Sequence, residues 1–405
     1  MDNKKNGIPK LRFPGFTGAW EQRKLGEIGK VFTGNTPSTK NTENWTTDKS
    51  IGHVWITPTD INNNIMFDSE RYLSDKGWSQ ARVVPKNSVL ITSIASIGKN
   101  AINGVEVAFN QQINALVVQK NNPYFILTLM NKEKQRFESL AGQTATPIIN
   151  KSTFSSFMVK IPSETEQEQI GEFFKQLDSL IALHQRKLEH LQEQKKGLLQ
   201  KMFPKNGETV PEVRFPGFTD AWEQRKFSEF ATYSGKRNKD NLDLEPYAIT
   251  SDNGFVRQSE AHNEFGYMKN TDRAAYKIVQ SNSFGYNPAR INIGSIGYYS
   301  GDKNIIVSSL YEVFKTNQDV NDEFLWIWFK SNRFQKWINK LQEGSVRLYF
   351  YYDKLRETKI QLPNLEEQRQ VADLFTNLDS LIALHQRKLE HLELMKKGLL
   401  QQMFV

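Results

Sequence analysis

The chain of 405 residues contains no cysteine. It therefore cannot form disulfides, thiolate zinc sites or a cysteine nucleophile, and such a composition suits a reducing cytoplasm. No apolar run approaches the roughly 18 residues that a membrane-spanning helix needs. The first ten residues are polar and lack the apolar segment of a signal peptide. We therefore expect a soluble cytoplasmic protein.

Catalytic motifs are also missing. Asn122-Pro123-Tyr124 and Asn287-Pro288-Ala289 each lack the second proline of the Asp/Asn-Pro-Pro-aromatic motif that amino-methyltransferases use. Gly98-Lys99 lacks both the first glycine and the following Ser/Thr of a P-loop. The six histidines do not group into a metal-binding pattern. We therefore predict no catalytic residue, no metal and no cofactor in this chain.

The charge balance is moderately basic. The chain has 53 Lys and Arg residues against 45 Asp and Glu residues, a formal net charge of +8. This balance fits a protein that binds a polyanion, and it fits an ordinary soluble basic protein equally well. The length predicts two or three domains.

The chain repeats itself. Residues 12–24 return as residues 214–226, with Gly18 replaced by Asp220 as the single difference. Residues 177–191 return unchanged as residues 378–392. The blocks between these repeats, 25–163 and 227–363, are similar in length but share little obvious identity. One scaffold therefore carries two different inserts.

The second repeat predicts two long helices with a heptad seam. Apolar or core-like positions recur in steps of four and three residues, which is the spacing of a coiled coil. The seam of the first helix, 164–203, is Leu177, Ile181, His184, Leu188, Leu191 and Leu198, and that of the second, 364–405, is Leu378, Ile382, His385, Leu389, Leu392 and Leu399. We interpret the two histidines as interfacial polar residues rather than ligands.

The two helices are expected to pack antiparallel within the chain. A helix of about 37 residues is roughly 55 Å long, whereas the link 204–212 reaches only about 30 Å. The second block must then lie near the far end of the first helix, and the second helix must run back. The alternative is that the helices form a dimerisation coiled coil between two chains.

The predicted fold class is therefore α/β, or α+β, with pseudo-two-fold symmetry. Two mixed α/β domains are separated by an intramolecular coiled coil of two long antiparallel helices. Short apolar runs predict strands at 89–91, 115–118 and 305–307, and each block is expected to end with a helix, at 124–140 and 321–341. The predicted domains are 1–163 with repeat motif 11–24, spacer helix 164–203, 204–363 with repeat motif 213–226, and spacer helix 364–405.

The first repeat contains bulky aromatic residues around a Pro-Gly turn. We expect its tryptophans, Trp20 and Trp222, to pack each block against the helices. The alternative is that they contact a partner protein.

At this level the chain resembles the specificity subunits of type I restriction-modification systems over essentially its whole length. The similar stretches are residues 52–61 and 108–114, Ser96-Ile97-Gly98-Lys99, residues 286–297, Glu166-Gln167-Glu168-Gln169-Ile170, and residues 366–371. Each stretch alone has low specificity. Their order, found twice along the chain, carries the resemblance.

The resemblance implies a non-catalytic, sequence-specific DNA-binding subunit. Each block would be a target-recognition domain that reads one half of a bipartite, asymmetric double-stranded DNA site. Two methyltransferase subunits and two restriction (motor) subunits would be its partners, and they would bring S-adenosylmethionine, ATP and magnesium. The alternatives are a self-sufficient adenine methyltransferase or nuclease with similar domains, and a coiled-coil protein with no DNA role.

Residue chemistry suggests which side chains contact DNA, because Arg and Lys pair with guanine or phosphate, and Asn and Gln with adenine. The candidates in the first block are Lys99, Asn110, Gln111, Gln112, Thr144 and Thr146. In the second block they are Lys236, Arg237, Lys239, Arg290, Asn292, Arg347 and Tyr349. Asn110 and Asn292 could instead hold turns through backbone hydrogen bonds, and residues 236–239 could form a solvated loop.

Overall fold

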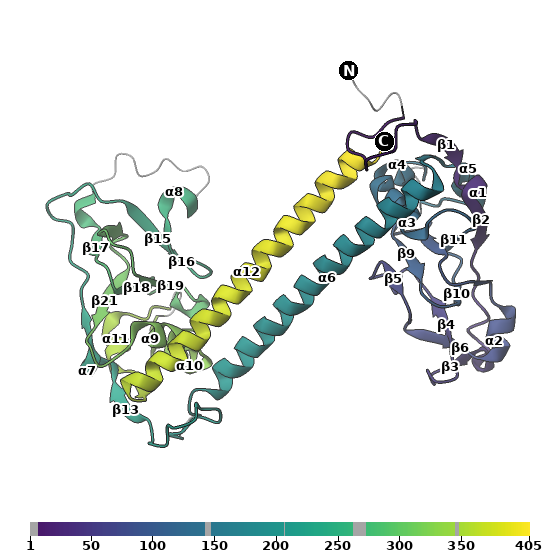
Figure 1. Ribbon diagram of the computed structural model, residues 1–405. Helices are drawn as coiled ribbons and strands as arrows, with labels where there is room; N and C mark the ends of the chain where they lie inside the picture. The colour runs from purple at the N-terminus through teal and green to yellow at the C-terminus, as the bar shows by residue number, and fades with distance from the viewer. Residues whose placement is uncertain (1–6, 142–146, 206, 262–272, 345–347) are drawn as a thin grey trace. The chain divides into compact units, whose positions relative to one another are not determined.

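A computed structural model describes residues 7–141, 147–205, 207–261, 273–344 and 348–405. The chain divides into two compact units (Figure 1). Unit 1 comprises residues 1–186 and 386–405, and unit 2 comprises residues 187–385. Each unit therefore contains one of the two unlike blocks together with parts of both long helices.

Unit 1 contains two five-stranded sheets and a two-stranded ribbon. The sheet orders are β3-β6-β4-β10-β7 and β2-β11-β8-β9-β5, and β1 pairs with β12. The elements of the block are β1 (Glu21–Lys24), α1 (Leu25–Ile28), β2 (Gly29–Thr33), β3 (Trp45–Thr46), β4 (His53–Ile56), β5 (Ile65–Met66), β6 (Arg71–Leu73), α2 (Asp75–Gln80), β7 (Val83–Val84), β8 (Val89–Thr92), β9 (Asn100–Asn103), β10 (Val107–Phe109), β11 (Ile113–Val118), α3 (Pro123–Lys132), α4 (Lys134–Glu138), α5 (Lys151–Ser156) and β12 (Met158–Ile161).

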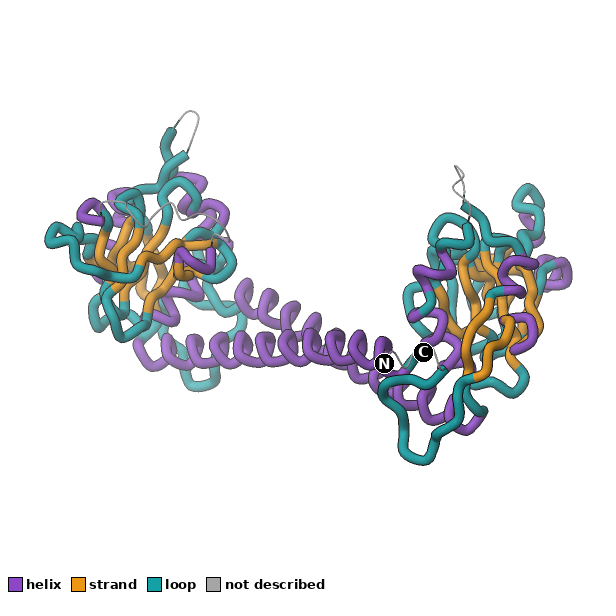
Figure 2. Tube along the Cα trace, turned by 90° about the horizontal axis from the view of Figure 1, so that it is seen from above, coloured by secondary structure: helices purple, strands orange, loops and turns teal. Residues whose placement is uncertain are grey.

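Strand β8 shows how the layers of unit 1 form. Successive side chains of a strand point to opposite faces, so Leu90 enters the core between the two sheets, whereas Val89 and Ile91 enter the core that faces the helices. The helix-side core also holds Phe125 of α3 and Phe404 near the chain's end. The block is therefore layered as sheet, sheet and helices, and the strands are visible in Figure 2.

Unit 2 follows the same plan with four-stranded instead of five-stranded sheets. The sheet orders are β14-β21-β18-β19 and β16-β15-β20-β17, and β13 pairs with β22. The elements of the block are β13 (Glu223–Lys226), α7 (Phe227–Phe230), β14 (Ala231–Tyr233), β15 (Pro246–Thr250), β16 (Gly254–Arg257), α8 (Gln258–Ala261), β17 (Lys277–Val279), β18 (Ser283–Tyr286), the 3-10 turn η4 (Ile291–Ile293), β19 (Ile296–Tyr299), β20 (Ile305–Val307), β21 (Glu312–Thr316), α9 (Asp322–Phe329), α10 (Asn332–Leu341), α11 (Tyr352–Glu357) and β22 (Lys359–Leu362).

The three predicted strands are confirmed as β8, β11 and β20, but each of the two predicted block helices is broken into two. In unit 1 the break falls at Glu133, which is buried and pairs with Lys132 and Arg136. In unit 2 the break falls before Ser331, whose hydroxyl donates to the Trp328 carbonyl at 2.6 Å. A side chain that bonds a neighbouring backbone group competes with the helix at this point.

The two long helices are α6 (Glu164–Lys201) and α12 (Leu365–Met403). Every seam residue named above is buried or half-buried, whereas the helices' other faces are largely exposed. Helix α6 ends two residues earlier than the predicted 203, because Met202 and Phe203 turn into the core of unit 2. No helix in the described part of the chain is both long and apolar enough to cross a membrane.

Within each unit the two helices run antiparallel. In unit 1, Asp178 pairs with Lys396 at 2.6 Å, and the ring of Phe174 lies 5.8 Å from that of Phe404. In unit 2, Lys195 pairs with Asp379. The repeat relates Asp178 to Asp379 and Lys195 to Lys396, so the two ion pairs are the same contact with the copies exchanged. The same two repeat positions therefore meet in each unit, with the helix that contributes each of them exchanged.

The first repeat motif attaches each block to the helices through a buried ion pair. Arg12 donates two hydrogen bonds of 2.7 Å to Glu166, in the first turn of α6, and Arg214 does the same to Glu367 of α12. Both carboxylates are 1% exposed. A carboxylate in the first turn is further favoured by the helix dipole.

The tryptophan of each first-repeat motif packs against the phenylalanine that follows the long helix of the other sequence repeat. Trp20 packs edge-on against Phe125 and against Phe404, which follows α12. In unit 2, Trp222 packs against Phe203, which follows α6, and against Phe324. Trp20 and Trp222 therefore bind block to helices, as the sequence predicts.

Breaking the buried pair should destabilise the fold. We expect Arg214→Met to lower the free energy of unfolding by about 3–5 kcal/mol, because it leaves a buried carboxylate without a partner. The double variant Arg214→Met/Glu367→Met should recover most of that loss. Urea denaturation of the complete chain measures both variants.

The control is Arg23→Ala, which removes an exposed pair with Glu21 (side chains 51% and 69% exposed) and should cost under about 1 kcal/mol. A loss for Arg214→Met no larger than this control would contradict the proposed anchoring role.

Candidate nucleic-acid interface

The strands of both sheets in unit 1 end at a common edge. Strand β11 is antiparallel to β2 and β8, and β4 is parallel to β10, so the loops after β2, β4, β8 and β10 come together. The loops of this edge, called edge 1 below, are residues 34–36, 57–62, 93–99, 110–112 and 147–149. The main-chain N–H of Ser93 donates to the Gln112 carbonyl at 2.8 Å, which joins two of them.

Lys99 and Gln111 both lie on edge 1. The Nζ of Lys99 donates to the Pro58 carbonyl and to Oδ1 of Asn62, each at 3.3 Å. Gln111 is exposed, and its Oε1 accepts a hydrogen bond of 2.6 Å from the Thr36 hydroxyl. The loops thus hold a cation and an amide in defined positions.

Asn110 has the structural role that the sequence left open. It is buried, its Oδ1 accepts from the main-chain N–H of Gln112 at 3.1 Å, and its Nδ2 donates to Oε1 of Gln112 at 2.8 Å. Both groups of its amide are used inside the turn. Asn110 therefore shapes edge 1, and Gln111 and Gln112 are the amides that the turn presents.

The loop 93–99 is held in a strained conformation. Ala95 has a φ of 63°, a left-handed value that residues other than glycine rarely adopt. The Thr92 hydroxyl bonds the loop from within and accepts from the main-chain N–H of Lys99 at 3.0 Å. Strain of this kind persists where surrounding contacts over-determine the backbone, and it gathers at functional sites.

Unit 2 has the corresponding edge, called edge 2. Strand β21 is antiparallel to β14 and β18, and β15 is parallel to β20. Edge 2 comprises Tyr233 at the end of β14 and the loops 234–242, 251–253, 287–295 and 308–311, with 343–344 and 348–351. The main-chain N–H of Phe350 donates to the Pro288 carbonyl at 3.0 Å and joins two of these loops.

The remaining described candidates fall on edge 2. Arg290 and Asn292 are exposed at the turn η4. Tyr349 is half-buried and stacks on Tyr351, with ring centroids 5.4 Å apart and planes 2° from parallel. Thr144, Thr146 and Arg347 lie outside the described residues.

The run Lys236-Arg237-Asn238-Lys239 divides into one buried and three exposed residues. Asn238 is buried and bonds both the N–H and the carbonyl of Leu242, each at 3.0 Å. Lys236, Arg237 and Lys239 are exposed and make no ion pair within the part of the chain that the structure describes. The buried asparagine therefore fixes a loop that carries three unneutralised cations.

Beneath edge 2 the charges are compensated. Burial raises the pKa of Glu312, and the charge of Lys277, 3.7 Å away, opposes this rise. Burial also raises the pKa of Tyr286 well above its usual value, so its hydroxyl stays neutral. The exposed loops of edge 2 carry the cations Lys236, Arg237, Lys239 and Arg290, which can attract phosphates, together with the acidic residues Asp240, Asp252 and Glu343.

Sequence reasoning did not select Thr36, Ser308 and Leu310, which lie on the same edges as the candidates. Thr36 follows β2 on edge 1, in the place that Lys236 and its neighbours occupy after β14. Ser308 and Leu310 follow β20, in the place that Asn110 and Gln112 occupy after β10. Aligning the two blocks strand by strand would have identified them, but the blocks share too little identity for the sequence to show that alignment.

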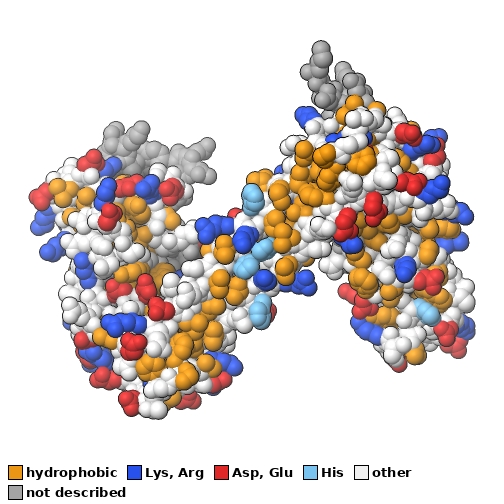
Figure 3. Space-filling view, in the orientation of Figure 1, with side chains coloured by type: hydrophobic (Ala, Val, Ile, Leu, Met, Phe, Trp, Pro, Cys, Tyr) orange, Lys and Arg blue, Asp and Glu red, His pale blue; other side chains and the backbone are white. Residues whose placement is uncertain are grey.

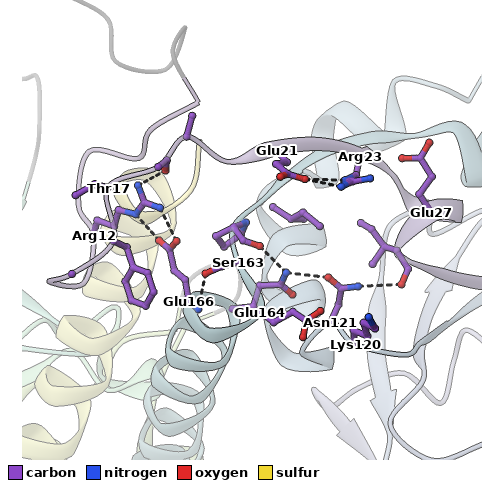
Figure 4. Close-up of a pocket in the computed structure, with 18 residues that line it drawn as sticks. Arg12, Thr17, Glu21, Arg23, Glu27, Lys120, Asn121, Ser163, Glu164 and Glu166 are labelled. Carbon is purple, nitrogen blue, oxygen red and sulfur yellow. Dashed lines mark hydrogen bonds and ion pairs between the residues drawn. The ribbon is translucent and has the colours of Figure 1, made fainter.

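A groove of about 760 Å³ in unit 1 lies apart from these loops, between the first repeat motif and the start of α6 (Figure 4). Its side chains are largely engaged with one another. Arg12 binds Glu166, Arg23 pairs with Glu21 at 2.7 Å, and Asn121 donates to the Ile28 carbonyl at 3.1 Å. We interpret this groove as part of the junction between block and helix.

No group of three or more potential metal-ligating side chains occurs among the described residues. Comparison with known proteins identifies the class to which this arrangement belongs. The family model for the type I restriction modification DNA specificity domain matches the chain twice, at residues 18–193 and 219–394. The chain therefore belongs to the type I restriction-modification DNA specificity family. More narrowly, it is a type I specificity subunit with one copy of the domain in each half.

Named relatives agree with this assignment. The chain is 22% identical to the type I restriction enzyme MjaVIII specificity subunit of Methanocaldococcus jannaschii, over 94% of this chain and 91% of that protein. It is 28% identical to the EcoR124I/EcoR124II specificity subunit of Escherichia coli, over 40% of this chain and 42% of that protein. The fold is similar to the crystal structure of the type I S subunit from M. genitalium, with a TM-score of 0.61, 14% identity, and coverage of 98% of this chain and 99% of that one.

The exposed cations of edge 2 should contribute to DNA affinity through phosphates. We expect the triple variant Lys236→Gln/Arg237→Gln/Lys239→Gln to bind DNA more weakly, with a shallower dependence on salt. The slope of log affinity against log salt changes by about 0.9 for each phosphate that the protein no longer neutralises, so the expected change is up to about 3. Titration of labelled duplexes at several salt concentrations measures the slope.

Lys303→Gln is the matched control, because this exposed lysine follows β19 at the opposite end of the sheet. It should leave the slope unchanged. Equal slopes for the triple variant and the unmodified chain would show that these cations do not meet phosphates.

Proposed function

We propose that this chain reads a bipartite, asymmetric DNA sequence, with one half read by edge 1 and the other by edge 2. The observation that carries the proposal is the contrast between an identical frame and two unlike edges. The same ion pair and tryptophan attach both blocks to the helices. A nearly symmetric frame with different reading surfaces yields an asymmetric target.

The chemistry of each edge suits contact with a duplex. Edge 1 presents Lys99 and Gln111, which are side chains that pair with guanine and adenine in the major groove. Edge 2 combines Arg290 with the three cations at 236, 237 and 239, which can position phosphates. Both edges are built of loops at strand ends, and such loops commonly carry binding residues on a rigid scaffold.

We propose that the two helices set the distance between the half-sites. Each helix is a continuous rod with a packed seam, and rods of this kind transmit spacing without stretching. The nonspecific base pairs of a bipartite site would then match the helix length. The antiparallel pairing of the helices within each unit supports this proposed role.

The helices also offer a surface for partners. Leu180 and Leu183 of α6 lie outside the seam and are 40% and 41% exposed, and Leu381 and Leu384 repeat them on α12 at 44% and 39%. Hydrophobic side chains are visible on the helix surfaces in Figure 3. We propose that these leucine pairs dock two copies of one methyltransferase subunit, since two identical surfaces fit one partner twice.

In this proposal the chain directs chemistry that its partners perform. Two methyltransferase subunits would bring S-adenosylmethionine, and two restriction (motor) subunits would bring ATP and magnesium. This chain would recognise the target sequence on double-stranded DNA. Methyl transfer to DNA by the purified chain alone would contradict the assignment and favour a self-sufficient enzyme.

Exchanging one block tests the division of the target. We expect that replacing residues 25–163 by the corresponding block of another specificity subunit changes one half of the methylated sequence and leaves the other half intact. The frame residues that attach the block stay in place, so the exchanged block should fold against the same helices. Genome-wide mapping of methylated adenines, with the original and the exchanged chain, gives the two sequences.

The reciprocal exchange of residues 227–363 is the control and should change the other half. A change in both halves after either exchange would mean that the blocks do not read independently.

Lengthening both helices tests their role as a spacer. We expect that seven residues inserted between Arg186 and Lys187, and seven between Arg387 and Lys388, lengthen the nonspecific spacer. Seven residues preserve the heptad seam and add about 10.5 Å, which corresponds to about three base pairs at 3.4 Å each. Methylation mapping gives the spacer length directly.

An insertion in α6 alone is the control. It shifts Lys195 and Asp379 out of register and should reduce assembly rather than give a new spacer. An unchanged spacer after the double insertion would exclude the helices as the element that sets it.

A further inference from the structure

Edge 2 carries an unusual concentration of exposed apolar side chains. Within the described part of residues 227–363, all six large hydrophobic side chains that are exposed lie on this edge: Tyr233, Leu242, Ile293, Leu310, Leu348 and Tyr351. Single exposed apolar residues are ordinary on protein surfaces. Their confinement to one edge marks an interaction surface, since a patch of this kind is otherwise a liability.

The two edges differ at one structurally equivalent turn. On edge 1, Asn110 holds the turn after β10, and its side chain accepts from the N–H of Gln112 at 3.1 Å. On edge 2, the Ser308 hydroxyl holds the turn after β20 and accepts from the N–H of Leu310 at 3.3 Å. Leu310 therefore stands where Gln112 stands. One edge offers an amide at this point, and the other offers a bare isobutyl group.

Leu310 and Ile293 are the best placed for contact. They are 75% and 55% exposed, and they belong to the loops that follow β20 and β18. These loops lie next to each other, because Tyr286 at the end of β18 faces Glu312 at the start of β21. Arg290 stands three residues before Ile293, so apolar and cationic groups share one surface.

The exposed cations and apolar side chains of this surface suit an occupant that is both anionic and apolar at the point of contact. Lys236, Arg237 and Arg290 supply positive charge around the patch without an ion pair in the described structure. On duplex DNA, the phosphates supply the negative charge. The thymine C5-methyl group is the apolar feature of the base edges in the major groove.

We infer that edge 2 recognises thymine methyl groups in its half of the target through Leu310 and Ile293. The inference rests on the DNA-reading function proposed above and adds the chemistry by which one half-site is read. At the equivalent turn edge 1 presents the amides of Gln111 and Gln112, and its exposed apolar residue Ile148 lies on a different loop. The two halves of the site are thus distinguished by different contacts.

The test removes the methyl group alone. Once methylation mapping has given the target, each thymine of the edge 2 half-site is replaced by deoxyuridine, which keeps the base pairing and lacks the methyl. Affinity is measured for the full chain, alone and together with the methyltransferase subunit. At least one replacement should weaken binding by about fourfold, the factor expected for one buried apolar carbon.

Protein variants then connect that thymine to a side chain. In Leu310→Ala or Ile293→Ala, the ratio of affinities for the thymine and deoxyuridine duplexes should fall to about one. These exposed side chains can be shortened without loss of core packing. A second variant, Leu310→Gln, places the amide of edge 1 on edge 2 and should also abolish the preference for the methyl group.

Two controls isolate the effect. Ile51→Ala shortens an equally exposed residue that lies outside both edges and should preserve the ratio. Replacing thymine by deoxyuridine in the edge 1 half-site should change the DNA affinity of the Leu310→Ala variant and of the unmodified chain by the same factor.

Several outcomes would overturn the inference while leaving DNA reading intact. They are an edge 2 half-site without an A·T pair, a thymine preference that both alanine variants retain, and a Leu310→Ala variant that weakens only assembly with the methyltransferase subunit. Failure of the proposed function itself has a different signature, which is the loss of any sequence preference in the unmodified chain.

Discussion

The architecture depends on a buried Arg–Glu ion pair that occurs twice. Arg12 and Arg214 each bind a carboxylate that is 1% exposed in the first turn of a long helix. A charge removed from water must be fully satisfied where it lies, so each pair admits a single placement of the repeat motif on its helix. The tryptophan of the same motif then meets the phenylalanine that ends the other helix. Each block is held by both rods, and the unlike loops are carried on a rigid base.

Each of these contacts occurs once in each unit, with the two copies of the sequence repeat in exchanged roles. Asp178 pairs with Lys396, and Lys195 pairs with Asp379. The main-chain N–H of Leu11 donates to the Gln402 carbonyl at 2.9 Å, and that of Val213 donates to the Lys201 carbonyl at 3.1 Å. A duplicated sequence thus builds the same junction in both units, although in unit 2 a linker connects the helix to the motif and in unit 1 the two segments come from opposite ends of the chain.

The two edges differ although the frame that carries them is the same. Asn110 is buried and holds a turn that has the half-buried amide of Gln112 at the position where the turn held by Ser308 has the exposed side chain of Leu310. The residues that hold the turn, Asn110 and Ser308, hydrogen-bond the backbone, whereas Leu310 is 75% exposed.

The sequence alone determined the duplication, the two long helices and their seam, since identity and heptad spacing are local signals that survive in a linear string. It also identified the three strands β8, β11 and β20, and the tryptophans that join block to helix. Only the tertiary structure decided that Asn110 and Asn238 are buried supports whereas Gln111 and Lys239 face outward, because identical residue types lie a few positions apart in each loop. The matching of Leu310 with Gln112 likewise depends on strand pairing between distant segments. Contacts of that kind depend on which backbones meet across a sheet, a relation that residue order does not express.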